Sequence, residues 1–193
     1  SNFRFRINVF YQKGLLALSF HYIPGVIKSF DDLGLPEVCG NFLKVSSGLV
    51  IIAGAYNSGK TTTAAALIEE LNKTKALNIV TIEDPIEYLF ISKTSLVIQR
   101  QIGTDVNTVA EALDYCLSED VDAVYINEVK DNQVFNSAMP KIFELASGNC
   151  LVILEINAAS SKRVLEKVLA GLVLNLPLEA ARYNLADILI GVL

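Results

Sequence analysis

The sequence predicts an α/β protein with a mostly parallel sheet, preceded by a β-hairpin. Three observations support this fold class. From residue 48 onward, short runs rich in valine, isoleucine and leucine alternate with longer segments of helical periodicity, an order typical of parallel sheets covered by helices. The apolar runs show no polar–apolar alternation, as expected of strands that are buried on both faces. Residues 3–10 do alternate, which indicates a strand of another kind.

The N-terminal segment is predicted to form the hairpin. In "FRFRINVF", residues 3–10, polar and apolar side chains alternate, so one face of this strand should be half-buried. The apolar face consists of Phe3, Phe5, Ile7 and Val9, and the polar face of Arg4, Arg6 and Asn8. The turn "QKG" separates it from a partner strand over 15–23. A Pro-Gly pair ends the hairpin, and residues 24–47 then form a linker with one short helix around 30–45.

The elements after residue 48 follow from two patterns, apolar runs for strands and helical spacing for helices. Strands are expected over residues 49–54, 78–82, 94–99, 121–126 and 150–156. Helices are expected from the end of a glycine-rich loop to about residue 71, and over 106–119, 132–147, 161–172 and 179–192. This alternation predicts a doubly wound sheet.

Composition and charge exclude several classes of protein. The 193 residues are 52% hydrophobic and 19% charged, which is typical of one globular core with a small appendage. The net charge of −5 argues against nucleic acid as a partner. Cys39, Cys116 and Cys150 form no CxxC pair, so we expect a reducing, cytoplasmic environment. No apolar run approaches the roughly 18 residues of a membrane span, so direct membrane insertion is not expected.

The stretch "GAYNSGKTTT", residues 54–63, matches the phosphate-binding pattern G-x-x-x-x-G-K-[ST]. Its glycines let the backbone curl so that several N–H groups point at phosphate oxygens, and the following helix adds its positive dipole end. We expect Lys60 to reach the β- and γ-phosphates and the Thr61 hydroxyl to ligate Mg²⁺. The residues assigned to nucleotide binding are Gly54, Asn57, Ser58, Gly59, Lys60, Thr61 and Thr62.

A second candidate group follows the strand predicted over 121–126. In "VDAVYINE" the apolar run delivers Glu128 to the edge of the sheet beside this P-loop, where a carboxylate can orient Mg²⁺ or its waters. A solvated glutamate after a buried strand is the alternative interpretation. The P-loop does not name the reaction, because small kinases, GTPases and motor ATPases share it. The GTPase pattern N-K-x-D is absent, and we find neither an arginine-rich lid nor an acceptor site for a kinase.

Two stretches, "GLVIIAGAYNSGKTTT" and "KTKALNIVTIEDPIE", carry a family resemblance that extends from "RFRINVFYQKG" to "LADILIGVL". Together they resemble the type II/IV secretion ATPases, in particular the PilT-type pilus-retraction ATPases. The resemblance implies a RecA-like P-loop NTPase core over residues 48–193, without the helical C-terminal part of the family. Residues 1–23 would be the last strands of an N-terminal PAS-like domain, and 24–47 the linker.

The resemblance also implies roles for individual residues. The box "EDPIE" carries over to Glu83, Asp84 and Glu87, and Glu83 would polarise the attacking water. Glu128 corresponds to the glutamate of the family's second motif, and Thr61 with Glu128 would hold Mg²⁺, directly or through water. In the family, ATP lies between one subunit and the N-terminal domain of a neighbour in a ring of six. The candidate arginines that act in trans are Arg6, Arg4 and Arg100.

Several functional positions depart from the family pattern. Asn149 and Ile156 stand where the family has two histidines, and isoleucine offers neither donor nor acceptor. His21 replaces an arginine and is a weak substitute for a guanidinium. Further replacements are Asp114 and Ser118 for arginines, Asn127 for a glycine and Lys130 for an arginine. Glu155 interrupts an apolar run and needs a partner or solvent. Because an arginine finger is worth about 10³–10⁵ in rate, we expect ATP binding with slow hydrolysis.

Two functions follow, and they differ in catalysis. The first is a cytoplasmic ATPase of the pilus-retraction and secretion class, in which a hexameric ring couples ATP hydrolysis to pilus dynamics against an inner-membrane platform protein. The second is a catalytically weak or inactive nucleotide-binding paralogue that regulates or completes an active motor ring. In both, the ligand is ATP with Mg²⁺, and the protein is peripheral to the inner membrane through the pilus machine.

Overall fold

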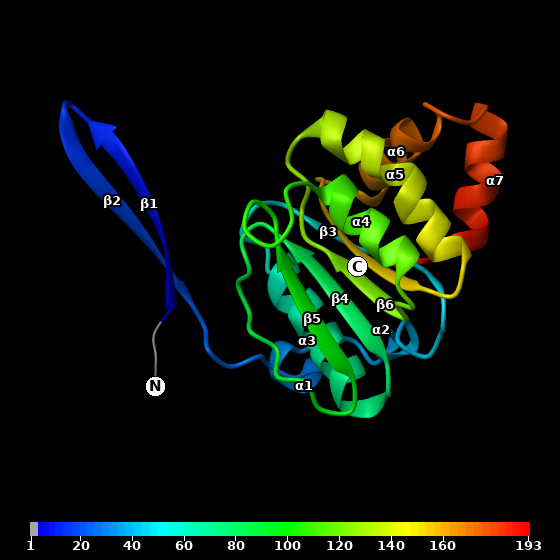
Figure 1. Ribbon diagram of the computed structural model, residues 1–193, viewed down its shortest axis with the longest axis horizontal. Helices are drawn as coiled ribbons and strands as arrows, with labels where there is room; N and C mark the ends of the chain where they lie inside the picture. The colour runs from blue at the N-terminus through cyan, green and yellow to red at the C-terminus, as the bar shows by residue number, and fades with distance from the viewer. Residues whose placement is uncertain (1–3) are drawn as a thin grey trace.

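The computed structural model describes residues 4–193 and confirms the α/β class with an N-terminal hairpin (Figure 1). The hairpin consists of β1 (Arg4–Gln12) and β2 (Leu15–Ile23), which pair antiparallel. It projects away from the α/β body and is joined to it by an extended segment. Phe3, which the sequence places on the same strand, lies outside the described residues.

The apolar face of the hairpin is exposed, so the prediction of a half-buried strand is wrong for this chain. Phe5, Ile7 and Val9 are 49%, 51% and 56% exposed. The ring of Phe5 contacts those of Phe20 and Tyr22 on the partner strand, with centroids 6.3 and 5.6 Å apart. Alternation identifies a face that is suited to packing, but burial needs a second layer, and residues 4–193 leave these side chains largely uncovered.

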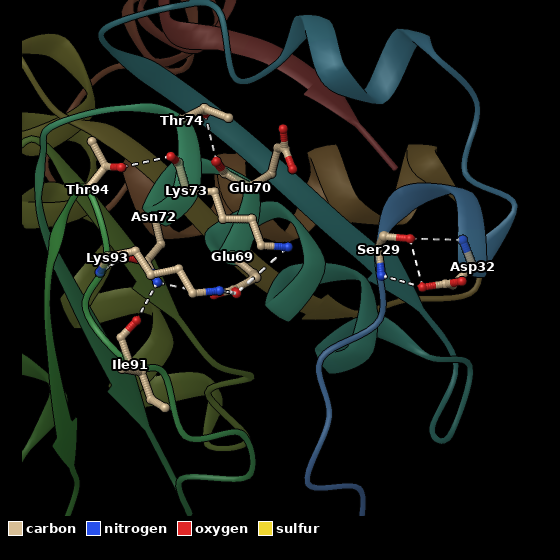
Figure 2. A network of polar contacts seen from close by, with 10 residues as sticks. All are labelled: Ser29, Asp32, Glu69, Glu70, Asn72, Lys73, Thr74, Ile91, Lys93 and Thr94. Carbon is tan, nitrogen blue, oxygen red and sulfur yellow. Dashed lines mark hydrogen bonds and ion pairs between the residues drawn. The ribbon is translucent and has the colours of Figure 1, made fainter.

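The linker contains two short helices in place of the single helix predicted around 30–45. In α1 (Phe30–Leu33), the Ser29 hydroxyl accepts a hydrogen bond from the Asp32 amide, and the Asp32 carboxylate accepts one from the Ser29 amide (Figure 2). Gly34, with φ 63°, ends α1 in the left-handed conformation that favours glycine. This stop separates α1 from α2 (Val38–Asn41).

A six-stranded sheet forms the body, in the order β5-β4-β6-β7-β3-β8 with every pair parallel. Its strands are β3 (Gly48–Gly54), β4 (Asn78–Glu83), β5 (Leu96–Gln101), β6 (Ala123–Ile126), β7 (Leu151–Asn157) and β8 (Leu189–Val192). The helices are α3 (Lys60–Thr74), α4 (Val109–Ser118), α5 (Asn132–Ser147), α6 (Ser161–Leu172) and α7 (Leu178–Ile188). Helix α3 packs on one face, and α4 to α7 cover the other. Because the strands are parallel, their carboxyl ends meet at one edge, where ligands bind in such folds.

The end of the chain differs from the prediction. The helix expected over 179–192 stops at Ile188, and residues 189–192 form β8 beside β3. The Leu193 amide donates to the Ile51 carbonyl at 2.8 Å, so the pairing continues past the strand. An apolar run of this length suits a helix or a buried strand equally well, and the open edge of β3 decides in favour of the strand.

Other boundaries shift by a few residues for local reasons. The helix expected from residue 106 begins at Val109, because the Thr108 hydroxyl caps it by accepting from the Glu111 amide. The strand expected over 94–99 lies at 96–101, in register with β4. None of the helices in the described part of the chain is long and apolar enough to cross a membrane.

Helix α3 is fastened to the segment between β4 and β5 by a buried amide (Figure 2). Asn72 is completely buried, and its side chain donates to the Ile91 carbonyl at 2.8 Å and accepts from the Lys93 amide at 3.0 Å. The Lys93 ammonium in turn contacts the Glu69 carboxylate. These contacts satisfy the polar groups beside the helix and hold in place the element that carries Lys60.

Candidate nucleotide-binding site

The glycine-rich loop joins the carboxyl end of β3 to the first turn of α3. Gly54 has no room for a side chain, since an added Cβ would lie 2.4 Å from the Ser58 hydroxyl oxygen. Gly59 precedes α3 with φ 96°, and Asn57 has φ 59°. The tight curl leaves the unpaired N–H groups of the helix at the loop. A cavity of about 280 Å³ opens there, lined by residues 56–62.

Lys60 lies in the wall of this cavity and is buried. Its ammonium donates to the carbonyls of Gly54 at 3.3 Å and Ala55 at 3.0 Å, and it lies 3.4 Å from a carboxylate oxygen of Glu128. Glu128, which follows β6, lines the same cavity. The structure therefore brings together two predicted groups that are distant in sequence.

The carboxylate of Glu155 on β7 lies against the first turn of α3. It is 2% exposed and lines the cavity. Its Oε1 accepts a hydrogen bond from the Tyr125 hydroxyl at 2.6 Å, and its Oε2 accepts one from the Thr61 hydroxyl at 3.3 Å. Burial raises the pKa of this carboxyl to about 7, and the two hydrogen bonds and the charge of Lys60 act in the opposite direction.

Glu83, at the end of β4, is absent from the residues that line the P-loop cavity in the described chain. It is 2% exposed and accepts hydrogen bonds from the Thr81 hydroxyl at 2.7 Å and the Gln99 side-chain amide at 3.0 Å. Burial raises its pKa above the ordinary value, although these hydrogen bonds oppose the shift. With Asp84 and Glu128 it lines an adjoining cavity of about 300 Å³. Its action on an attacking water stays a prediction.

The hairpin supplies the opposite wall of the P-loop cavity through Arg6 and His21. A guanidinium nitrogen of Arg6 lies 3.0 Å from a Glu87 carboxylate oxygen, and another donates to the Tyr56 hydroxyl at 3.5 Å. Arg4 donates to the Glu87 carbonyl and, at 3.0 Å, to the carbonyl before it. Both arginines thus contact residues of their own chain, and Arg6 lines the cavity of its own P-loop. Action on a neighbouring subunit stays a prediction.

Arg100 lies away from the cavity, on the edge strand β5. One of its nitrogens donates to both carboxylate oxygens of Glu119, at 2.8 and 3.0 Å. Its guanidinium carbon lies 5.5 Å from the centre of the Tyr115 ring. These contacts engage Arg100 on the α4 side of the sheet, so any part in nucleotide chemistry would concern another subunit.

The positions predicted to depart from the family pattern are dispersed. Ile156 is 1% exposed and belongs to the core on the α4–α7 side, whereas Asn149 is exposed ahead of β7, at the far end of the strand from the P-loop. Lys130 lines the cavity with its own positive charge, and its ammonium nitrogen lies 3.7 Å from an Asp84 carboxylate oxygen.

Sequence reasoning missed the tyrosines of the site, because a tyrosine in an apolar run is usually a core residue. Tyr125 is one of these, and the Tyr88 hydroxyl lies 3.1 Å from that of Thr62. One sequence signal pointed to this part of the site, namely Glu155, a charged residue within a run of aliphatic side chains. Its neighbours come from β6 and α3, which the sequence does not show to be adjacent.

The donors at the cavity fit Mg²⁺. The Thr61 hydroxyl and the carboxylates of Glu128 and Glu155 offer oxygen, the donor that Mg²⁺ prefers. Between residues 4 and 193, no cluster of three or more His, Cys, Asp or Glu could hold a metal ion. In nucleotide sites, Mg²⁺ is bound by few protein groups together with substrate phosphates.

Residues 30–147 match the model of the family described as type II/IV secretion system protein. The chain is 36% identical over 165 residues to a type IV pilus retraction ATPase, PilT, of Pseudomonas aeruginosa, which covers 86% of this chain and 47% of the relative. It is 34% identical over 166 residues to the type IV pilus ATPase PilU of the same organism, which covers 86% of this chain and 42% of that protein. The chain thus spans about half the length of these relatives.

Solved structures agree with the fold. A pilus retraction motor PilT with bound ADP matches with a TM-score of 0.84 and 34% identity, over 97% of this chain and 53% of that one. The ATPase DotB of Legionella pneumophila matches with a TM-score of 0.82 over 97% of this chain and 52% of that one. At 18% identity, the second comparison supports the fold alone.

Proposed function

Because this chain belongs to the type II/IV secretion system protein family, we propose that it is an ATP-binding motor ATPase of the pilus-retraction and secretion class. The observation that carries the proposal is the P-loop cavity. There Lys60 from α3 and Glu128 from the end of β6 meet at 3.4 Å, with Thr61 in the first helical turn. A relative that is 34% identical was solved with ADP.

The residues at the cavity and beside it would have two kinds of role, binding of the nucleotide and catalysis of its hydrolysis. The loop amides and Lys60 would hold the phosphates, and Thr61 with Glu128 would hold Mg²⁺, directly or through water. Bound Mg²⁺ would supply charge neutralisation on the phosphate oxygens. Glu83 would orient the attacking water, and Arg6 and Arg4 on the hairpin would stabilise the charge that develops on the transferred phosphate.

We propose the domain division and the assembly on the same grounds. Residues 1–23 would belong to a PAS-like domain, 24–47 to a linker and 48–193 to the RecA-like domain. The exposed apolar side chains of the hairpin are suited to packing against a second layer. A hexameric ring in the cytoplasm, bound to an inner-membrane platform protein, would turn ATP hydrolysis into pilus movement.

A nucleotide-binding paralogue with little or no turnover is the second candidate. It is favoured by Ile156, a buried aliphatic residue at a family histidine position, and by Glu83, which hydrogen bonds hold outside the P-loop cavity. Such a subunit would regulate or complete the ring of an active motor.

The test measures binding, assembly and turnover on the complete natural protein. We expect it to bind MgATP and to form a ring by native mass spectrometry, and failure in both would refute the proposal. Single-turnover hydrolysis is then compared between the wild type and Glu83→Gln. A slower variant supports the ATPase, whereas equal rates support the paralogue.

A further inference from the structure

Glu155 is the one carboxylate of the P-loop cavity that forms no ion pair among the described residues. The other three acids each have one: Glu87 pairs with Arg6, Asp84 with Lys130, and Glu128 with Lys60. Among the described residues, Glu155 forms hydrogen bonds with the hydroxyls of Tyr125 and Thr61, and the charge of Lys60 acts on it from a greater distance than an ion pair. The charged form of a carboxylate that is 2% exposed is costly, and a cation beside it would offset this cost.

The position of Glu155 indicates which cation that is. Its Oε2 lies 3.3 Å from the hydroxyl oxygen of Thr61, the P-loop residue type that ligates Mg²⁺. In octahedral coordination with Mg–O distances of about 2.1 Å, adjacent ligand oxygens lie about 3 Å apart. The Thr61–Glu155 spacing is therefore close to that of two neighbouring positions around one Mg²⁺ ion or its water shell.

The packing of Glu155 keeps this oxygen at the cavity. Ile52 of β3 lies beside Glu155 in register, and β6 places Tyr125 on the same face of the sheet. The Tyr125 hydroxyl binds Oε1 at 2.6 Å, which leaves Oε2 on the side of Thr61. Tyr125 thus orients the carboxylate in the way that outer groups orient metal ligands.

We propose that Glu155 is a third protein group of the metal site, bound to the Mg²⁺ ion of the nucleotide directly or through one water. The inference rests on the proposed nucleotide binding and adds a residue that the P-loop pattern does not include. With metal, Glu155 strengthens nucleotide binding, and without metal its negative charge repels the phosphates, so binding should depend strongly on Mg²⁺.

The test uses Glu155→Gln in the full chain, because glutamine retains an acceptor for Tyr125 and removes the charge. The Kd of a fluorescent ADP is measured with Mg²⁺ and with EDTA, and Mn²⁺ affinity of the protein–ADP complex is measured by electron paramagnetic resonance. We expect Glu155→Gln to lower the Mn²⁺ affinity of the protein–ADP complex about 10- to 100-fold. The ratio of the Kd for ADP in EDTA to the Kd in Mg²⁺ should decrease by a similar factor. Glu155→Asp, which keeps the charge, should recover part of the loss.

The control is Glu166→Gln, on an exposed surface of α6 with its side chain 61% exposed, which should change neither quantity. Circular dichroism verifies that each variant is folded, and Glu155→Asp provides the comparison if Glu155→Gln is not. Wild-type-like Mn²⁺ affinity in both Glu155 variants would overturn this inference and leave nucleotide binding standing. Failure of the wild type to bind ADP with Mg²⁺ would overturn the proposed function and this inference together.

Discussion

The two walls of the P-loop cavity differ in how the protein holds them. The wall from the sheet is built by β3, β6, β7 and α3, and its key groups are buried: Lys60 is 8% exposed and Glu155 2%. The wall from the hairpin presents Arg6, whose side chain is 35% exposed, on strands with uncovered apolar side chains. One wall is part of the core, and the other touches it through a few polar contacts.

This difference suits the wall from the sheet to nucleotide binding and the wall from the hairpin to the chemical step. Groups that the core holds rigidly lose little freedom when a phosphate arrives, so they suit affinity. Groups on a loosely held hairpin can move relative to the core and suit a step that depends on closure or on a neighbour. The departures predicted at His21 and Ile156 lie outside the phosphate-binding pattern of residues 54–61, which is complete.

The largest effect should come from a stability test of the two regions. Phe135 is 1% exposed in the core, and Phe20 on the hairpin is 60% exposed. We expect Phe135→Ala to reduce the free energy of unfolding by about 3–5 kcal/mol, because it leaves a cavity. Phe20→Ala should cost less than about 0.5 kcal/mol. Urea unfolding measures both, and equal costs would show that the hairpin is covered in solution.

A second test removes the buried cation of the sheet wall. Lys60→Ala should weaken binding of a fluorescent ADP with Mg²⁺ about 10- to 150-fold, which corresponds to about 1.5–3 kcal/mol for hydrogen bonds to a charged group. Lys162→Ala is the matched control, since the Lys162 side chain is 85% exposed on α6. A similar loss in both variants would contradict a specific role for Lys60.

The third test moves to the hairpin wall. Arg6→Ala should weaken ADP binding less than about fivefold, because a partly exposed ion pair such as Arg6–Glu87 contributes about 1 kcal/mol or less. If the chain hydrolyses ATP, the single-turnover rate should fall further than the affinity does. If Arg6→Ala weakened ADP binding as much as Lys60→Ala does, the two walls would not differ in their contribution to affinity.

The smallest effect concerns pH and the buried carboxyl of Glu83. Burial raises its pKa in the folded protein above the ordinary value of 4.5. The folded state therefore holds this proton more tightly than the unfolded state does, and its stability falls as pH rises above 4.5 through the raised pKa. We expect the melting temperature of the wild type to fall relative to Glu83→Gln over this window. Parallel melting curves for the two proteins would contradict the shift.

Much of the fold could be predicted because local pattern and tertiary environment agree. The helices over 132–147 and 161–172 match their predicted bounds, and the P-loop lies between β3 and α3 as its sequence requires. The end of the last helix was predicted wrongly at residue 192, because "LADILIGVL" has apolar side chains at spacings that suit a helix or a strand. The pairing of this segment with β3 depends on which sheet edge is open.

The candidate site was predictable to the extent that it is local. Lys60 and Thr61 are six and seven residues from Gly54, so one short pattern reveals them. Arg100 lies on β5 beside Glu119 and away from the P-loop, because β5 is at the edge of the sheet and far from β3. A prediction for such a residue requires the strand order.

The sequence by itself determined the class of the fold, the phosphate loop and the family, because each is encoded in contiguous residues. Only the tertiary structure decided that Glu155 faces Thr61, that Glu83 is held outside the loop's cavity and that Arg6 of the hairpin lines the cavity of its own P-loop. These contacts join segments that lie tens of residues apart. Their energies depend on burial and charge proximity, which exist only after the strands have been ordered into one sheet.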